Sequence, residues 1–196
     1  MVFKNTVNEY GLIAKWFHWG TVLLFLISYC AIYYRELFAD SDFENWITIQ
    51  LHFSIGISIF GIVLMRIVWR SLNTSPNQES FSTVHLIMIK AGHIALYKVM
   101  LIMPISGYLS LVNYLTCKNG NIDYFFLLDL TFLKSTEFCR SYSSVLITLE
   151  KPADFIHSIT GKWLVPTLVL GHLLAALYHH FIKQDNTLNK ITRHKS

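Results

Sequence analysis

The stretch ITIQLHFSIGISIFGIVLMRIVW, residues 47–69, decides the fold of this 196-residue chain. It holds one histidine, one arginine and no acidic residue, and most of its other side chains are apolar. As a helix rising about 1.5 Å per residue, it is long enough to cross the roughly 30 Å of hydrocarbon in a bilayer. Three further stretches share this character. The sequence therefore predicts an all-α bundle of four transmembrane helices, at residues 12–34, 47–69, 84–112 and 155–182.

The composition of the chain agrees with a membrane protein. Hydrophobic residues make up 53% of it and charged residues only 14%, whereas soluble domains contain about 25% charged residues. A soluble or disordered chain is therefore excluded, and we expect one domain over residues 1–196, surrounded by membrane lipid. The net charge of +4 includes no basic cluster that could follow a phosphate backbone, which excludes nucleic acid as a partner.

The distribution of lysine and arginine predicts the orientation of the helices. The N-terminal segment, the loop between the second and third helices and the C-terminal tail together carry more of these residues than the opposite side does. Basic residues resist translocation, so both termini are predicted to face the cytoplasm. The side of the termini is accordingly called inner below, and the opposite side outer.

The connection between the third and fourth helices, residues 113–154, is much longer than the roughly two to eight residues usual in helical bundles. We predict that this outer loop is structured. Its apolar run at residues 124–133 is expected to form a short helix at the membrane interface, or to pack over the outer ends of the bundle. Cys117 and Cys139 lie in the same connection, where an oxidising compartment would allow a disulfide, with two free thiols as the alternative.

Several histidines lie at membrane depth, where an ionisable side chain is costly unless it has a partner. Counting residues along each helix places His18 near the inner surface and His52 near the outer one. In the fourth helix, His157 lies near the outer end, and His172 lies fifteen residues, or about 22 Å, further in. The depths therefore predict an outer pair, His52 with His157, and an inner pair, His18 with His172.

Two histidines that face each other at one depth can supply both axial ligands of a haem iron. Two such pairs predict two haems. Because protein fills both axial positions of each iron, the pattern indicates electron transfer. Zinc fits less well, since it favours three or four ligands at one point. The other alternative is that the histidines only form hydrogen bonds between helices.

Other residues of the second helix fit a haem at each depth. Arg66 follows His52 by fourteen residues, which returns it to within about 40° of the same face at the inner depth. It is a candidate to neutralise an inner haem propionate, or it only extends to the inner surface. Gly56 and Gly61 remove side chains either where a flat macrocycle approaches or where helices pack closely.

These residues resemble the bacterial cytochrome b561 family over nearly the whole chain. The segment GHLLAALYHHFIKQDNTL, residues 171–188, is similar to the closing signature of that family. The other shared motifs are His18-Trp19, Tyr29-Cys30-Ala31 with Arg35, His52 with Gly56, Arg66, and Gly92-His93 with Tyr97, Pro104 and Gly107. The resemblance implies a four-helix protein of the bacterial inner membrane with two haem b groups, whose axial ligands are His18, His52, His157 and His172.

The chain departs from the family pattern in its fourth helix. The family places the two ligands of that helix fourteen residues apart, whereas His157 and His172 are fifteen apart, with Pro166 between them. A proline disturbs helical hydrogen bonding, and a one-residue bulge beside it would absorb the extra position. Lys98 and Lys162 are also unusual at membrane depth, where each needs an anion or a wet cavity.

The remaining histidines have open roles. His93 matches a family position and is a candidate to touch a haem edge or a quinone head group, with a bond to a neighbouring carbonyl as the alternative. For His179 and His180, at the inner end, a propionate contact or an inner-surface hydrogen bond is expected. His85 and His194 are expected at the surface.

The resemblance implies an oxidoreductase that moves single electrons between a membrane quinone and a donor or acceptor at the outer face. It admits superoxide as the donor, with ubiquinone reduced. Lys162 or Lys151 is the candidate to attract this anion, and both, with His93, are the candidates for a catalytic role. A second hypothesis is a haem-bearing membrane anchor of a larger hydrogenase or dehydrogenase complex. A third is a haem-free transporter or scaffold.

Overall fold

The computed structural model of the chain describes residues 3–77, 82–117, 123–129 and 136–192. Its elements are α1 (Leu12–Leu37), α2 (Asp42–Leu72), α3 (Thr83–Cys117), β1 (Asp123–Tyr124), β2 (Leu128–Asp129), α4 (Thr136–Ile159), η2 (Thr160–Leu164), α5 (Val165–Phe181) and α6 (Asn189–Thr192). Helix η2 is a single π-helical turn that joins α4 to α5 without a break. The fold is helical apart from the two-stranded β1–β2 hairpin.

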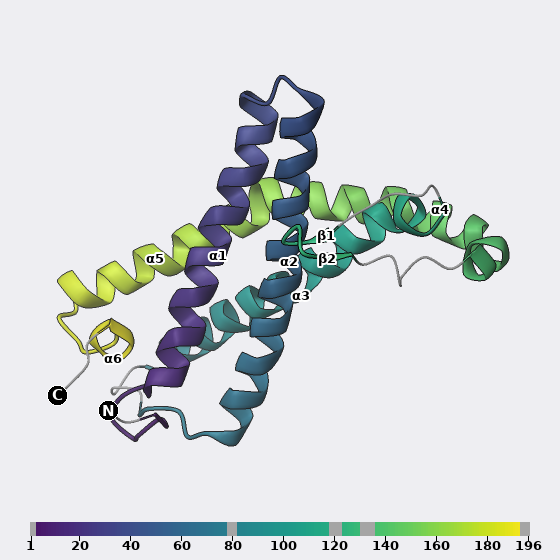
Figure 1. Cartoon of the computed structure of the whole chain (residues 1–196). Helices are drawn as coiled ribbons and strands as arrows, with labels where there is room; N and C mark the ends of the chain where they lie inside the picture. The colour runs from purple at the N-terminus through teal and green to yellow at the C-terminus, as the bar shows by residue number, and fades with distance from the viewer. Residues whose placement is uncertain (1–2, 78–81, 118–122, 130–135, 193–196) are drawn as a thin grey trace.

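Four helical segments are long and apolar enough to cross a membrane, which confirms the predicted four-helix architecture. Figure 1 shows α1 and α2 side by side as one helical hairpin, which crosses the long rod formed by α4, η2 and α5. α3 packs mainly along α4. The largest buried cluster lies on α2 and α3 and consists of Ile55, Ile59, Val63 and Met100.

The fourth helix begins much earlier than predicted. It starts at Thr136 instead of residue 155, and its candidate membrane span is Ile147–Phe181. Glu150, Lys151 and Pro152 are typical of a loop, but here they continue the helix, with the proline inside it. In a continuous helix, nearly all backbone N–H and C=O groups of this segment have hydrogen-bond partners, which is needed close to the membrane. This requirement outweighs the preference of these residues for a loop.

The predicted interfacial helix at residues 124–133 is wrong over its described part. Residues 123–129 form an antiparallel hairpin, in which Asp123 pairs with Asp129. Phe125 and Phe126 make the turn with φ of 50° and 62°, in the left-handed region. The alternative prediction was packing over the outer ends of the bundle; the structure shows that this run does pack on the bundle, with Phe125 against the buried cluster of α2 and α3.

Polar side chains of α2 hold this hairpin in place. Gln50 Oε1 accepts a hydrogen bond from Asp123 N at 2.9 Å, and Ser54 Oγ accepts one from Phe125 N at 2.9 Å. Gln50 and Ser54 are both completely buried. Buried polar groups require such partners, and a hairpin offers backbone donors that a helix would use internally. The side chains of Cys117 and Cys139 lie outside the described residues, so their disulfide stays a prediction.

Three segments meet at the end of the molecule where both termini lie (Figure 1). Asn77 N donates to Val7 O at 2.8 Å, which joins the α2–α3 connection to the N-terminal segment. Lys190 Nζ donates to Asn77 O at 2.8 Å, and Trp19 Nε1 donates to Ile191 O at 3.2 Å. An even number of crossings requires both termini on one side, and these bonds fix the C-terminal tail there.

Candidate functional site

The predicted outer pair meets between α2 and α4. The ring centroids of His52 and His157 lie 6.0 Å apart, with the ring planes at 88°. Both residues are half-buried among the helices. The structure therefore brings together two imidazoles that are more than 100 positions apart in the sequence, at the depth that helix counting gave.

Hydrogen bonds orient both rings of the outer pair. His52 Nδ1 lies 2.9 Å from Ser28 Oγ and 3.3 Å from the Ser28 carbonyl oxygen. His157 Nδ1 lies 2.9 Å from the Met103 carbonyl oxygen and 3.3 Å from Ser106 Oγ. A carbonyl only accepts, so Nδ1 carries the proton in each ring and Nε2 keeps its lone pair. This is the tautomer that metal-binding histidines adopt when a neighbouring carbonyl holds their other nitrogen.

The spacing of the two rings fits axial ligands of a single iron. A metal–imidazole bond is about 2 Å long and the ring centre lies about 1 Å behind the nitrogen, so two opposing ligands have centroids about 6 Å apart. The separation of 6.0 Å between His52 and His157 matches this value. The donor set and its geometry thus fit a bis-histidine haem.

Gly107 of α3 makes room for one of these rings. A Cβ built on Gly107 would lie 2.8 Å from Cε1 and 3.1 Å from Nδ1 of His157. Real Cβ atoms essentially never approach a heavy atom so closely. The bond from His157 Nδ1 to the Met103 carbonyl holds the ring against this same turn of α3, so any larger residue at position 107 must displace it.

Substitution Gly107→Ala should lower the haem content at the outer pair by at least half. In a helix, glycine to alanine is normally favourable by about 1 kcal/mol, so a loss would come from the contact with His157 and not from helix propensity. Haem per chain of the purified variant is the measurement. Gly92→Ala is the matched control on the same helix, because a Cβ there meets no atom within 4 Å. Equal haem contents in both variants would contradict this role of Gly107.

Three imidazoles meet at the inner level. The centroids of His18 and His172 lie 6.3 Å apart with ring planes at 60°. Those of His93 and His172 lie 5.8 Å apart with planes at 65°. Both separations are compatible with a shared iron, and His172 is common to both. The structure therefore adds His93 to the predicted inner pair as a neighbour of the same site.

Arg66 lies at this inner level, as its spacing from His52 predicted. Its Nη2 is 3.4 Å from His18 Nδ1, and its guanidinium lies 5.4 Å from the centre of the Tyr97 ring. The guanidinium of Arg70 lies 5.8 Å from the same ring. Arg66 is half-buried beside the inner histidines, where its charge suits a carboxylate of a bound group.

The glycines of α2 do not mark close helix packing. A Cβ built on Gly56 or on Gly61 meets no atom of the described residues within 4 Å. By contrast, a Cβ on Gly161 would lie 3.1 Å from Met103 Cε, as expected at a tight helix contact. The packing alternative for the α2 glycines is therefore not supported, and the open space at Gly56, one turn from His52 and within about 40° of its face, agrees with the approach of a flat macrocycle.

The π-helical turn η2 confirms the predicted bulge beside Pro166. A π-turn inserts one extra residue into a helix, so the fifteen-residue spacing of His157 and His172 acts as a fourteen-residue spacing. A π-turn disturbs the regular backbone hydrogen bonds of a helix. Here the Gly161 carbonyl, inside the turn, accepts a hydrogen bond from Tyr29 OH at 2.6 Å. This bond ties α1 to the bulge.

The two lysines considered for a catalytic role lie apart from the paired histidines. Lys162 Nζ is 3.3 Å from Glu36 Oε1, and both side chains are largely exposed, at 55% and 41%. The anion that Lys162 was expected to need is thus a carboxylate of α1. Lys151 is exposed on α4 and Lys98 is exposed on α3, and neither forms an ion pair with any residue the structure describes.

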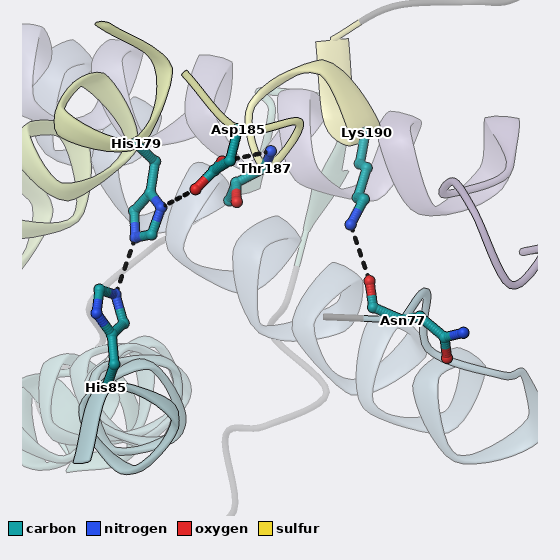
Figure 2. A network of polar contacts seen from close by, with 6 residues as sticks. All are labelled: Asn77, His85, His179, Asp185, Thr187 and Lys190. Atoms are coloured by element: carbon teal, nitrogen blue, oxygen red, sulfur yellow. Dashed lines mark hydrogen bonds and ion pairs between the residues drawn. The ribbon is translucent and has the colours of Figure 1, made fainter. Parts of the chain in front are cut away.

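A second histidine cluster lies at the inner end, as Figure 2 shows. His85 Nε2 is 3.1 Å from His179 Nε2, and His179 Nδ1 is 2.5 Å from Asp185 Oδ2. His85 is half-buried and hydrogen-bonded, so its assignment to the surface is wrong. The inner-surface hydrogen bond expected for His179 is confirmed. His194 lies outside the described residues.

The Asp185 carboxylate anchors the C-terminal tail to this cluster. Burial alone would raise the pKa of Asp185, but hydrogen bonds from Thr187 and His179 outweigh it and hold the pKa below 3.8. Thr187 N donates to Asp185 Oδ1 at 2.9 Å. Because the folded pKa is depressed, the stabilisation is complete above the ordinary pKa and disappears as pH falls through the folded value. The tail therefore stays anchored at neutral pH.

Comparisons with known proteins point to one family of membrane cytochromes. A family model described as prokaryotic cytochrome b561 matches residues 9–194. "Cytochrome b561 homolog 2" of Escherichia coli (strain K12) is 29% identical over 197 residues, which cover 97% of this chain and 95% of that protein. "Probable superoxide oxidase CybB" of Yersinia pestis is 24% identical over 92% of this chain and 94% of its own length. "Cytochrome b561 homolog 1" of Escherichia coli is 25% identical over 93% and 96%.

Proposed function

The chain belongs to the prokaryotic cytochrome b561 family, and on that premise we propose that it transfers electrons across the membrane by means of two haem b groups. It is a multi-pass protein of the bacterial inner membrane with four apolar helices. Its family role is membrane electron transfer, which makes it an oxidoreductase. The excess of lysine and arginine on the side of the termini supports a cytoplasmic location for both ends.

The proposal assigns an axial role to four histidines. His52 and His157 hold the outer haem, and His172 with His18 holds the inner one. When bound, each haem would supply reversible one-electron chemistry between the two histidines that hold it. The outer pair supports this proposal most strongly. The ring centroids of His52 and His157 are 6.0 Å apart. The carbonyl oxygens of Met103 and Ser28 accept hydrogen bonds from the Nδ1 atoms of His157 and His52.

The residues around each level position the rings and balance charge. Ser28, Ser106 and the Met103 carbonyl fix the tautomers of the outer histidines. Arg66, beside His18, supplies positive charge where an inner propionate would lie. Gly56 leaves open space one turn from His52, since a Cβ there meets no described atom within 4 Å.

We infer that superoxide is the electron donor at the outer face and ubiquinone the acceptor. Two superoxide ions each lose one electron and leave as dioxygen, and one ubiquinone gains these two electrons and two protons to become ubiquinol. The relative from Yersinia pestis described as a probable superoxide oxidase supports this choice. Of the two lysines considered, Lys151 is the better candidate to attract the anion, because Glu36 neutralises Lys162.

Purified, haem-loaded protein should consume superoxide faster than spontaneous dismutation when a soluble ubiquinone is present, and ubiquinol should form at one per two superoxide ions. Without the quinone, consumption should fall to the rate of spontaneous dismutation once the haems are reduced. A rate equal to spontaneous dismutation in both conditions would contradict the superoxide assignment and would favour a membrane-anchor subunit of a larger redox complex.

A further inference from the structure

We propose that Arg35 binds a propionate carboxylate at the outer level, as the counterpart of Arg66 at the inner level. This inference rests on the proposed function, because it assumes a haem between His52 and His157. It concerns a residue that neither the depth analysis nor the histidine pairing assigned.

A buried nitrogen of Arg35 has no hydrogen-bond partner within the described part of the chain. Among these residues, only Arg35 Nε and Trp69 Nε1 are buried side-chain nitrogen or oxygen atoms without a partner. An unpaired N–H of a charged guanidinium costs more free energy than an unpaired neutral donor, because its hydration is stronger. Arg35 is therefore a cation in a half-buried position that still needs an acceptor.

The position of Arg35 on α1 points to the outer histidines. It follows Ser28 by seven residues, so the two share a helix face to within about 20°. Ser28 is buried and bonds to His52 Nδ1 at 2.9 Å, which shows that this face of α1 lies against the outer pair. Arg35 lies about 10 Å further toward the outer end. This rise along α1 from Ser28 to Arg35 is similar to the distance from a haem iron to its propionate carboxylates.

Two neighbouring carboxylates, those of Glu36 and Glu44, are engaged elsewhere. Glu36 pairs with Lys162 at 3.3 Å. Glu44 accepts hydrogen bonds from Tyr34 OH at 3.0 Å and from Ser41 Oγ at 2.9 Å, within the capping box that starts α2. No carboxylate of a described residue forms an ion pair with Arg35. The acceptor that fits is thus an external carboxylate at the outer level, and an outer haem propionate is the one that the proposed function supplies.

By neutralising a propionate carboxylate, the positive charge of Arg35 should raise the reduction potential of the outer haem. Reduction adds negative charge to the site, so removing a nearby cation disfavours it. We expect Arg35→Gln to make the outer haem about tenfold harder to reduce, or about 59 mV lower for one electron. The variant should also lose this haem several times faster to an apo-globin acceptor. Arg35→Lys keeps the charge, so it should keep most of the potential but not the slow dissociation, because lysine lacks the planar donor fork.

The test uses detergent-purified holoprotein and a potentiometric titration, with the outer haem identified as the one missing from His52→Ala. Arg140→Gln is the matched control, because it removes the same charge from an exposed position of α4 and should leave the potential unchanged. An unchanged potential and unchanged haem dissociation in Arg35→Gln would overturn the inference. If superoxide consumption alone fell, the anion would be the substrate and the propionate assignment would be wrong. A wild-type protein without haem would instead overturn the proposed function itself.

Discussion

Replacing His52 by alanine should halve the haem content of the purified protein. The His157 ring would keep its bond to the Met103 carbonyl, but it would face no second imidazole across the 6.0 Å gap. A single axial ligand leaves the iron five-coordinate and weakly held. Haem per chain and the reduced-minus-oxidised visible spectrum are the measurements, and the inner haem should keep its spectrum.

The matched control for this prediction is His180→Ala. His180 lies at the end of α5, beside Phe181, and belongs to neither pair. It should retain the full haem content, which would show that losing a histidine from these helices does not by itself unfold the bundle. If His52→Ala lost both haems while His180→Ala kept them, the division of the histidines into two levels would be wrong.

Replacing His172 by alanine should remove the inner haem and leave the outer one. His172 is the residue that both His18 and His93 face, at 6.3 Å and 5.8 Å, so no other imidazole can replace it on α5 at this level. Haem content should again fall by half, and the remaining spectrum should match the one that His52→Ala loses. Full haem content in this variant would exclude His172 as a ligand.

Two further variants identify the partner of His172. The proposal assigns this role to His18, so His18→Ala should lose the inner haem, whereas His93→Ala should keep it with a shifted potential. The opposite result would move the ligand from α1 to α3. Arg66 would then serve a carboxylate beside His93, since it also lies over the Tyr97 ring of α3.

The arrangement of the histidines was largely predictable from the sequence. Apolar stretches fix four helices, and the constant rise of a helix turns residue numbers into depths. This arithmetic placed His52 level with His157 and Arg66 level with His18, and the structure agrees. The π-turn beside Pro166 was also predictable. His157 and His172 must face the same side of the helix, and a π-turn keeps them there when one extra residue lies between them.

The outer segment was harder to predict. Glu150, Lys151 and Pro152 have the local preferences of a loop, yet they lie inside α4 because the chain packs along α3. The apolar run near Phe125 has the composition of a helix. It folds as a hairpin because buried Gln50 and Ser54 on α2 require backbone partners. Both outcomes depend on contacts with residues far away in the sequence, which local patterns do not contain.

The inner cluster of His85, His179 and Asp185 was missed for a different reason. Asp185 follows the end of α5, and Gln184 before it has a φ of 53°, which turns the carboxylate back toward His179. A left-handed glutamine has no clear sequence signal. Depth was the signal that could have predicted this cluster. His85 lies at the start of α3 and His179 at the end of α5, so both lie at the inner end of the bundle.

The most direct test of this account is the haem-to-protein ratio of the purified chain, measured together with its reduced-minus-oxidised visible spectrum. The account predicts two haems per chain, both with the sharp bands of six-coordinate b-type haem. A ratio of one, or no haem, would contradict the two-level arrangement, and so would the spectrum of an iron with an open axial position.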